Sequence, residues 1–239
     1  MINDALTYLR TSDDWVRTVV IGGLLTLFGF LVVPTVLVAG YLVRVLRATM
    51  HGDDAPPAFD DWGDLAGDGV RAFAIAVVYG LVPTLLIAVT AAGSGLAAGP
   101  GSRSGLIVGG VAVVGGVVAL VVGLVVAYAL PAALANYAET GRVGAGFAVA
   151  DLRPVLTSGT YATAWLTGVA VVIGAGVVAG LLNVVPLLGT AVGAGVGFYA
   201  VTAAYYLVGH AWGDVRELER HDGEARAKRP AVRASSRTE

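Results

Sequence analysis

The chain of 239 residues contains no cysteine and few charged residues, which make up only 13% of it. Without cysteine, neither a disulfide framework nor a cysteine-ligated metal site can form. Soluble proteins carry about twice this share of charge, roughly 25%. Here 56% of the residues are hydrophobic, and the mean hydropathy is +0.78. These shortages exclude a soluble globular enzyme and a disordered chain, and they predict a membrane protein with several spans.

Basic residues and catalytic groupings are also scarce. The net charge of −2 leaves no basic field for binding nucleic acid. Lys228 is the one lysine, so the chain has no phosphate-binding loop that ends in Gly-Lys. The three histidines lack the spacing of metal ligands, and no Ser-His-Asp arrangement is evident. We therefore expect no catalytic residues, no cofactor and no metal, and the protein is predicted not to be an enzyme.

Uncharged stretches mark the predicted membrane spans. A helix needs about 20 apolar residues to cross the hydrocarbon core, and four stretches meet this plainly: 73–92, 105–135, 161–182 and 189–209. A fifth stretch, 18–43, is long for one span and short for two, and Pro34 near its middle disfavours a continuous helix. The predicted fold is an all-α, polytopic transmembrane helix bundle. Six helices are favoured, and five remain the alternative.

Internal similarity indicates that the helices are paired. The sequence Val32-Val33-Pro34 recurs as Val184-Val185-Pro186, and Asp14, Asp68 and Ser158 stand where a helix N-cap is wanted. This pattern predicts a threefold repetition of helical hairpins joined by amphipathic interfacial linkers. We divide the chain into a transmembrane domain over 1–212, with linkers at 43–72 and 139–160, and a charged, largely disordered tail over 213–239.

The distribution of basic residues predicts the orientation. Twelve of the fifteen lie in the two linkers and the tail, whereas the opposite loops hold only Arg103. Membrane proteins keep their Lys- and Arg-rich loops on the cytoplasmic side. We therefore expect a multi-pass protein of the cell membrane with both linkers and the tail in the cytoplasm.

Glycine is abundant, with 34 residues, about twice its usual share of ~7%. Small residues spaced three or four apart allow helices to approach closely in lipid. This spacing predicts helix-packing roles for Gly105, Gly109, Gly116, Gly123, Gly189, Gly193 and Gly197. Packing within the bundle is favoured, and a homo-oligomer face or a glycine-lined substrate path are the alternatives.

The first linker is the most distinctive polar segment, with six aspartates between residues 53 and 68. The three-residue spacing of Phe59, Trp62 and Leu65 predicts the apolar face of a short amphipathic helix lying on the bilayer. A solvated acidic face, a docking surface for a partner and a hard-cation site are the alternatives. The candidate partner residues are Phe59, Asp60, Asp61, Trp62, Asp64 and Asp68.

Residues 40–73 carry a family resemblance. The run Gly40-Tyr41-Leu42-Val43-Arg44-Val45-Leu46-Arg47, the later Asp60-Asp61-Trp62 and the following Asp68-Gly69-Val70-Arg71-Ala72-Phe73 resemble the uncharacterised archaeal membrane family called domain of unknown function 4013. The resemblance implies a multi-span membrane protein common in salt-loving archaea. The excess of aspartate over glutamate, twelve to five, fits such a source. The family has no established activity, so no site residue is carried over.

The lack of charge inside the spans bears on function. Ion-coupled transporters place a charged group or a broken helix within the membrane, and here only Pro34, Pro83 and Pro131 offer such breaks. The favoured function is a non-enzymatic membrane scaffold or docking module. Its expected partners are the lipid bilayer, a protein on the cytoplasmic side and a second copy of the chain. A small transporter or permease-like subunit is the alternative, and an intramembrane enzyme ranks third.

Overall fold

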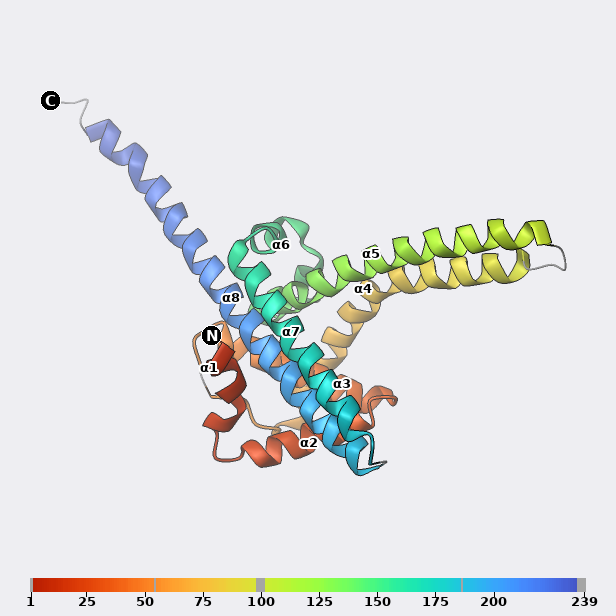
Figure 1. Cartoon of the computed structure of the whole chain (residues 1–239). Coiled ribbons are helices and arrows are strands. Elements are labelled where there is room, and N and C mark those ends of the chain that lie inside the picture. Colours follow the sequence, from red (N-terminus) through yellow and green to blue (C-terminus); the bar gives the residue numbers. More distant parts are fainter. Residues whose placement is uncertain (1, 54, 98–101, 186, 236–239) are drawn as a thin grey trace.

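The computed structural model describes residues 2–53, 55–97, 102–185 and 187–235, and this part of the chain contains helices and no strands (Figure 1). A short α1 (Ile2–Thr7) and the 3-10 turn η1 (Tyr8–Thr11) come first. Three consecutive hairpins follow, with η2 (Val143–Phe147) and α6 (Val149–Leu156) before the third. The hairpins are α2 (Trp15–Leu27) with α3 (Val32–Thr49), α4 (Trp62–Ala97) with α5 (Ser102–Thr140), and α7 (Gly159–Leu182) with α8 (Leu188–Ser235).

The predicted helical membrane bundle is confirmed. Among the described residues, α3, α4, α5, α7 and α8 are long and apolar enough to cross a membrane. The stretch 18–43 is divided into two helices, as the six-helix interpretation expects. However, α2 has 13 residues and is about 20 Å long at 1.5 Å per residue, which is less than the ~30 Å of the hydrocarbon core.

The break between α2 and α3 has a local cause. Leu31 has an extended backbone with φ −94° and ψ 145° and precedes the first turn of α3. Pro34 lies within that first turn, where its missing N–H costs no helical hydrogen bond. The hydroxyl of Thr35 donates to the carbonyl oxygen of Gly29 at 2.8 Å. The chain therefore turns back on itself here rather than forming one kinked helix.

The hairpins meet at one end and separate toward the other. Figure 1 shows the α4–α5 hairpin extending away from the α7–α8 hairpin.

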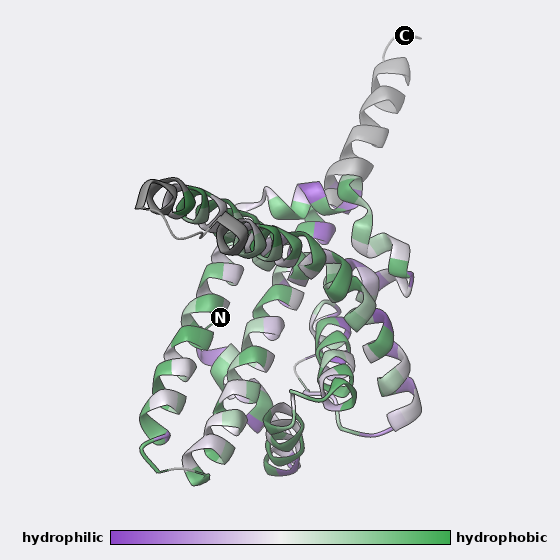
Figure 2. Cartoon of the chain, turned by 90° about the vertical axis from the view of Figure 1, so that its right-hand side faces the viewer, coloured by the Kyte–Doolittle hydropathy of each residue, from purple (hydrophilic) through white to green (hydrophobic). Residues whose placement is uncertain are grey.

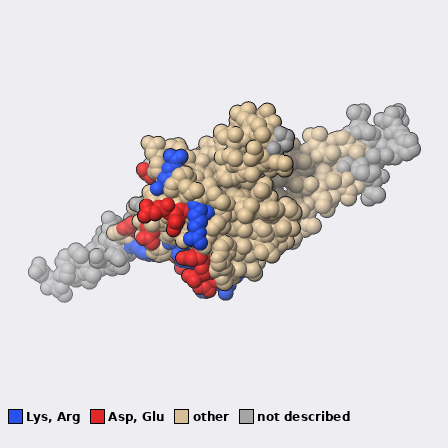
Figure 3. Space-filling view, turned by 90° about the horizontal axis from the view of Figure 1, so that it is seen from below, with Lys and Arg blue, Asp and Glu red and all other residues tan. Residues whose placement is uncertain are grey.

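The helices are mainly hydrophobic along their length (Figure 2), and acidic and basic side chains gather on one part of the face seen in Figure 3. Hydrogen bonds and ion pairs join η1, residues 44–53 and 55–71, residues 136–153 and α8 from His210 to His221. We call this set of segments the charged end.

The buried core lies beside the charged end rather than in the middle of the spans. Its largest fully buried side chains include Tyr8, Tyr41, Tyr137, Tyr161 and Trp212. By contrast, the most apolar 18-residue stretch of α4 is only 11% buried, and the corresponding stretch of α5 is only 6% buried. Because lipid provides no hydrophobic drive for helices to associate, these exposed apolar surfaces are suited to contact with hydrocarbon.

Some glycines bring two backbones into contact. A Cβ atom at Gly40 would fall on the carbonyl oxygen of Leu65, and one at Gly69 on that of Val36, so α3 and α4 touch through their main chains. In the third hairpin, a Cβ at Gly193 would lie 3.1 Å from that of Ala179, and Gly189 adjoins Leu182 at the turn. These contacts explain part of the glycine excess by close packing.

Other glycines of the predicted stripes face open space. A Cβ at Gly109, Gly116, Gly123 or Gly197 would meet no atom within 4 Å. Gly105 lies in the part of α5 where only the backbone is described. The packing role of these residues stays a prediction, and for the four with open surroundings only another molecule could fulfil it.

The C-terminal segment differs from the sequence prediction of a largely disordered tail over 213–239. The helical backbone of α8 continues to Ser235, and residues 236–239 lie outside the described part. The preceding apolar part of α8 is already helical. Extending it requires no new helix nucleus. The division of the chain into a transmembrane domain and a tail stays a prediction.

Replacing Gly69 with alanine is expected to destabilise the protein by about 1–3 kcal/mol, because a methyl group is forced into a packed contact. Gly116→Ala is the matched control, since its Cβ meets open space and alanine favours helix by ~1 kcal/mol. Unfolding of each purified variant in denaturing detergent, followed by circular dichroism, measures the difference. Equal stability of the two variants would contradict the close α3–α4 approach.

Candidate functional site at the charged end

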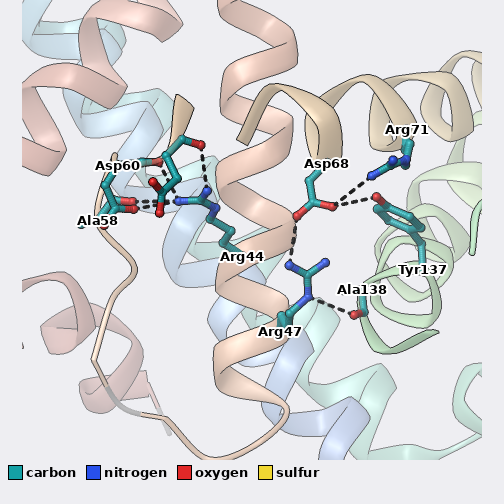
Figure 4. Close-up of polar contacts among 9 residues, drawn as sticks. Arg44, Arg47, Ala58, Asp60, Asp68, Arg71, Tyr137 and Ala138 are labelled. Atoms are coloured by element: carbon teal, nitrogen blue, oxygen red, sulfur yellow. Dashed lines mark hydrogen bonds and ion pairs between the residues drawn. The ribbon is translucent and has the colours of Figure 1, made fainter. Parts of the chain in front are cut away.

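Between α3 and α4, residues 50–53 and 55–61 form an irregular strap, and its end is held by Arg44. This side chain extends from α3, and its Nη1 donates to the backbone oxygen of Asp60 at 2.9 Å and to the Asp60 carboxylate at 2.9 Å. Its Nη2 donates to the backbone oxygen of Asp61 at 3.1 Å. Figure 4 shows this set of contacts. One arginine thus fixes both the path of the strap and the start of α4.

Phe59 fixes the strap from the inner side. Its ring is 5% exposed and stacks on Tyr41, with ring centroids 4.4 Å apart and planes at 10°. It also lies 6.0 Å from the ring of Phe198 on α8. The predicted short helix with Phe59, Trp62 and Leu65 on one membrane-facing side is therefore wrong. The helix begins at Trp62, and both Phe59 and Leu65 are buried in the protein core.

Asp68 joins three helices. It lies in the second turn of α4, and its carboxylate accepts from Nη1 of Arg47 on α3 at 3.0 Å and from the hydroxyl of Tyr137 on α5 at 2.9 Å. Nη1 of Arg71 lies 3.9 Å away, and Nε of Arg47 donates to the carbonyl of Ala138 at 3.2 Å. Figure 4 shows these side chains converging on the carboxylate. With 15% of its side chain exposed, Asp68 is a structural link rather than part of an outward surface.

Glu139 joins α5 to α8 in a similar way. Its Oε2 accepts from the indole Nε1 of Trp212 at 2.9 Å and lies 3.4 Å from Nε of Arg216. Its Oε1 lies 3.5 Å from Nη2 of Arg220. Close by, the buried Asn136 donates to the carbonyl of Ala145 at 2.9 Å. Polar contacts therefore tie the second hairpin to the first through Asp68 and to the third through Glu139.

A polar hollow of about 510 Å³ opens between the ends of α3, α5 and α8. All three histidines of the chain line it: His51, His210 and His221. Each Nδ1 lies 2.7–3.2 Å from the backbone oxygen four residues earlier. A carbonyl oxygen only accepts, so Nδ1 is the donor in each of these contacts. The hollow is lined by polar side chains that can form hydrogen bonds.

The sequence-predicted partner residues separate into two groups. Phe59 and Asp68 point into the structure, whereas Asp60, Asp61, Trp62 and Asp64 are exposed, with Trp62 at 47%. In the described part of the chain, no group of three or more His, Asp or Glu residues could hold a metal ion. Sequence reasoning did not find Arg44, Arg47, Glu139 or the shared histidine hollow. Each returning helix carries a tyrosine, at Tyr41, Tyr137 and Tyr206, and Tyr137 is the one that contacts Asp68 among these three.

Comparison with known proteins identifies the family. The family model described as "Protein of unknown function (DUF4013)" matches residues 24–184. The chain belongs to this family. The matched region of DUF4013 includes Arg44, Arg47, Asp68, Tyr137 and Glu139, but the α8 residues that contact Glu139 lie beyond it. No curated protein and no solved structure matches the chain.

Replacing Asp68 with asparagine is expected to destabilise the protein by about 1–3 kcal/mol, because Arg47 and Tyr137 lose a charged acceptor at a partly buried position. Asp64→Asn is the matched control, an exposed aspartate one turn earlier on α4. Unfolding in denaturing detergent measures both. If the two variants unfold alike, Asp68 does not hold the three helices together.

Proposed function

We propose that the protein is a non-enzymatic integral membrane module that presents a docking surface to a protein on the cytoplasmic side. The observation that carries this proposal is the exposed Trp62 with Asp60, Asp61 and Asp64 around it. We call these four residues the docking surface. Tryptophan is enriched among the residues that dominate binding energy at protein interfaces. An exposed tryptophan next to three exposed aspartates, of which Asp60 is paired with Arg44, suits a partner segment that carries Lys or Arg.

The contacts behind the docking surface support this proposal. Arg44 holds the backbone at Asp60 and Asp61, and Phe59 is buried against Tyr41. Ordering a loop on association costs free energy, so a surface that is already ordered binds more tightly. The carboxylates add attraction for a basic partner and increase the rate of encounter. The positive-inside distribution of Arg and Lys supports a cytoplasmic location for this surface.

Co-purification of the tagged full-length protein tests this function. The wild type is expected to retain a partner in stoichiometric amount. The variant Asp60→Asn/Asp61→Asn/Trp62→Ala is expected to bind it roughly thirtyfold more weakly, which corresponds to loss of about 2 kcal/mol at an interface tryptophan. Asp13→Asn/Asp14→Asn is the matched control, because it removes two exposed aspartates before α2.

A second variant distinguishes docking on an ordered strap from attraction to the aspartate charges alone. Arg44→Gln leaves every side chain of the docking surface in place but removes the donors that order the strap, so it is expected to weaken the same association. Partner retention at wild-type level by both the triple variant and Arg44→Gln, or the lack of any stoichiometric partner, would refute the docking function.

A small transporter or permease-like subunit is the second candidate. The polar hollow with its three histidines favours it, since such a hollow could receive a small polar solute at the charged end. Under this alternative, vesicles containing the full chain take up one of a panel of labelled polar solutes faster than protein-free vesicles. His210→Ala is then expected to lower that rate. Equal uptake by both kinds of vesicle across the panel would contradict transport.

A further inference from the structure

A groove of about 730 Å³ runs between α2 and the α7–α8 hairpin. Its walls are apolar and come from three helices, with Val20 and Leu24 on α2, Ala175 on α7, and Val192 on α8 among the lining residues. Val20 is 62% exposed, Leu24 55% and Val192 52%. These walls offer no hydrogen bonds to water, and in a bilayer they lie beside hydrocarbon chains.

α2 and α8 approach each other closely beside the groove, at Gly23 of α2 and Gly195 of α8. A Cβ at Gly23 would lie 2.8 Å from the Cα of Gly195, so the two backbones meet there. Beside this contact, the small side chains of Ala175 and Ala191 leave space uncovered. Small side chains therefore form part of the groove wall.

One part of the groove is polar. Arg10 is the single charged residue among its lining residues, and Trp15 and Tyr199 line it as well. The guanidinium carbon of Arg10 lies 5.7 Å from the centroid of the Trp15 ring. The hydroxyl of Tyr199 donates to the backbone oxygen of Leu6. An arginine beside an amphipathic tryptophan and tyrosine is the set of side chains found at lipid headgroup level.

We propose that this groove binds one anionic phospholipid of the surrounding bilayer, with an acyl chain along the apolar walls and its phosphate on Arg10. The guanidinium of arginine offers a planar pair of donors that fits phosphate. The chemistry of the groove matches both parts of such a lipid: apolar along its walls and cationic at Arg10. The exposed neighbours Asp13, Asp14 and Arg17 do not line the groove, so preference for an anionic headgroup depends on Arg10.

Quenching of Trp15 fluorescence tests the proposal. The full chain is placed in phosphatidylcholine vesicles that contain a small fraction of lipid with brominated chains, either phosphatidylglycerol or phosphatidylcholine. The contribution of Trp15 is the difference between the wild type and Trp15→Phe. Brominated phosphatidylglycerol is expected to be about fivefold enriched at Trp15 over brominated phosphatidylcholine, as expected for one arginine near an anionic lipid.

Two pairs of variants locate the source of this enrichment. Arg10→Gln is expected to reduce the ratio to one, whereas Arg17→Gln, an exposed arginine of α2 outside the groove, is expected to keep it. Ala175→Phe fills the groove and is expected to abolish the enrichment. Val178→Phe, at an exposed position of α7 that does not line the groove, is expected to preserve it.

Three results would overturn the proposal. They are equal quenching by the two brominated lipids in the wild type, an unchanged ratio in Arg10→Gln, and an unchanged ratio in Ala175→Phe. Free phosphate is distinguished from lipid by adding inorganic phosphate to the vesicles. Enrichment that persists when phosphate is added at constant ionic strength supports the lipid as the occupant, and its loss would show that free phosphate outcompetes the lipid at Arg10 and would contradict a lipid-selective site.

Discussion

The carboxylate of Asp68 is the contact on which the arrangement of the first two hairpins depends. It belongs to α4, yet it accepts hydrogen bonds from Arg47 of α3 and Tyr137 of α5. A partly buried charge that loses its partners is costly, so the three helices are held at one relative position here. The backbone contact at Gly69, one residue along, is possible only with the helices in that position.

The bilayer explains why such contacts lie at one end of the molecule. Charged groups within hydrocarbon are expensive, so the ion pairs of Asp68 and Glu139 gather where the spans begin or end. Farther along α4 and α5, the helices contact each other where Gly115 meets Thr90, and no charged pair is described there. The polar contacts thus hold the hairpins together at the charged end, and the apolar arms diverge from it.

The sequence predicts the local features of the fold and misses the distant pairings. Uncharged runs locate the spans, and the position of Pro34 indicates the division between α2 and α3. The spacing of Phe59, Trp62 and Leu65 suggested a surface helix, because the spacing does not reveal that Tyr41 and Phe198 provide stacking partners for Phe59. Likewise the sequence indicates Asp68 as a helix N-cap and a partner residue, because no local pattern reveals its contact with Tyr137, which is 69 residues away in the chain.

The N-terminal segment connects the two regions for which we propose partners. Tyr8 in η1 donates to the carbonyl oxygen of Ala55 in the strap at 3.4 Å, and its ring lies 4.5 Å from that of Tyr206 on α8. Two residues later, Arg10 lines the lipid groove. A lipid phosphate on Arg10 and a protein on Trp62 would therefore act on opposite ends of one continuous set of contacts. Because both sites adjoin this shared set of contacts, any change that lipid binding makes in partner affinity is matched by an equal change that partner binding makes in lipid affinity.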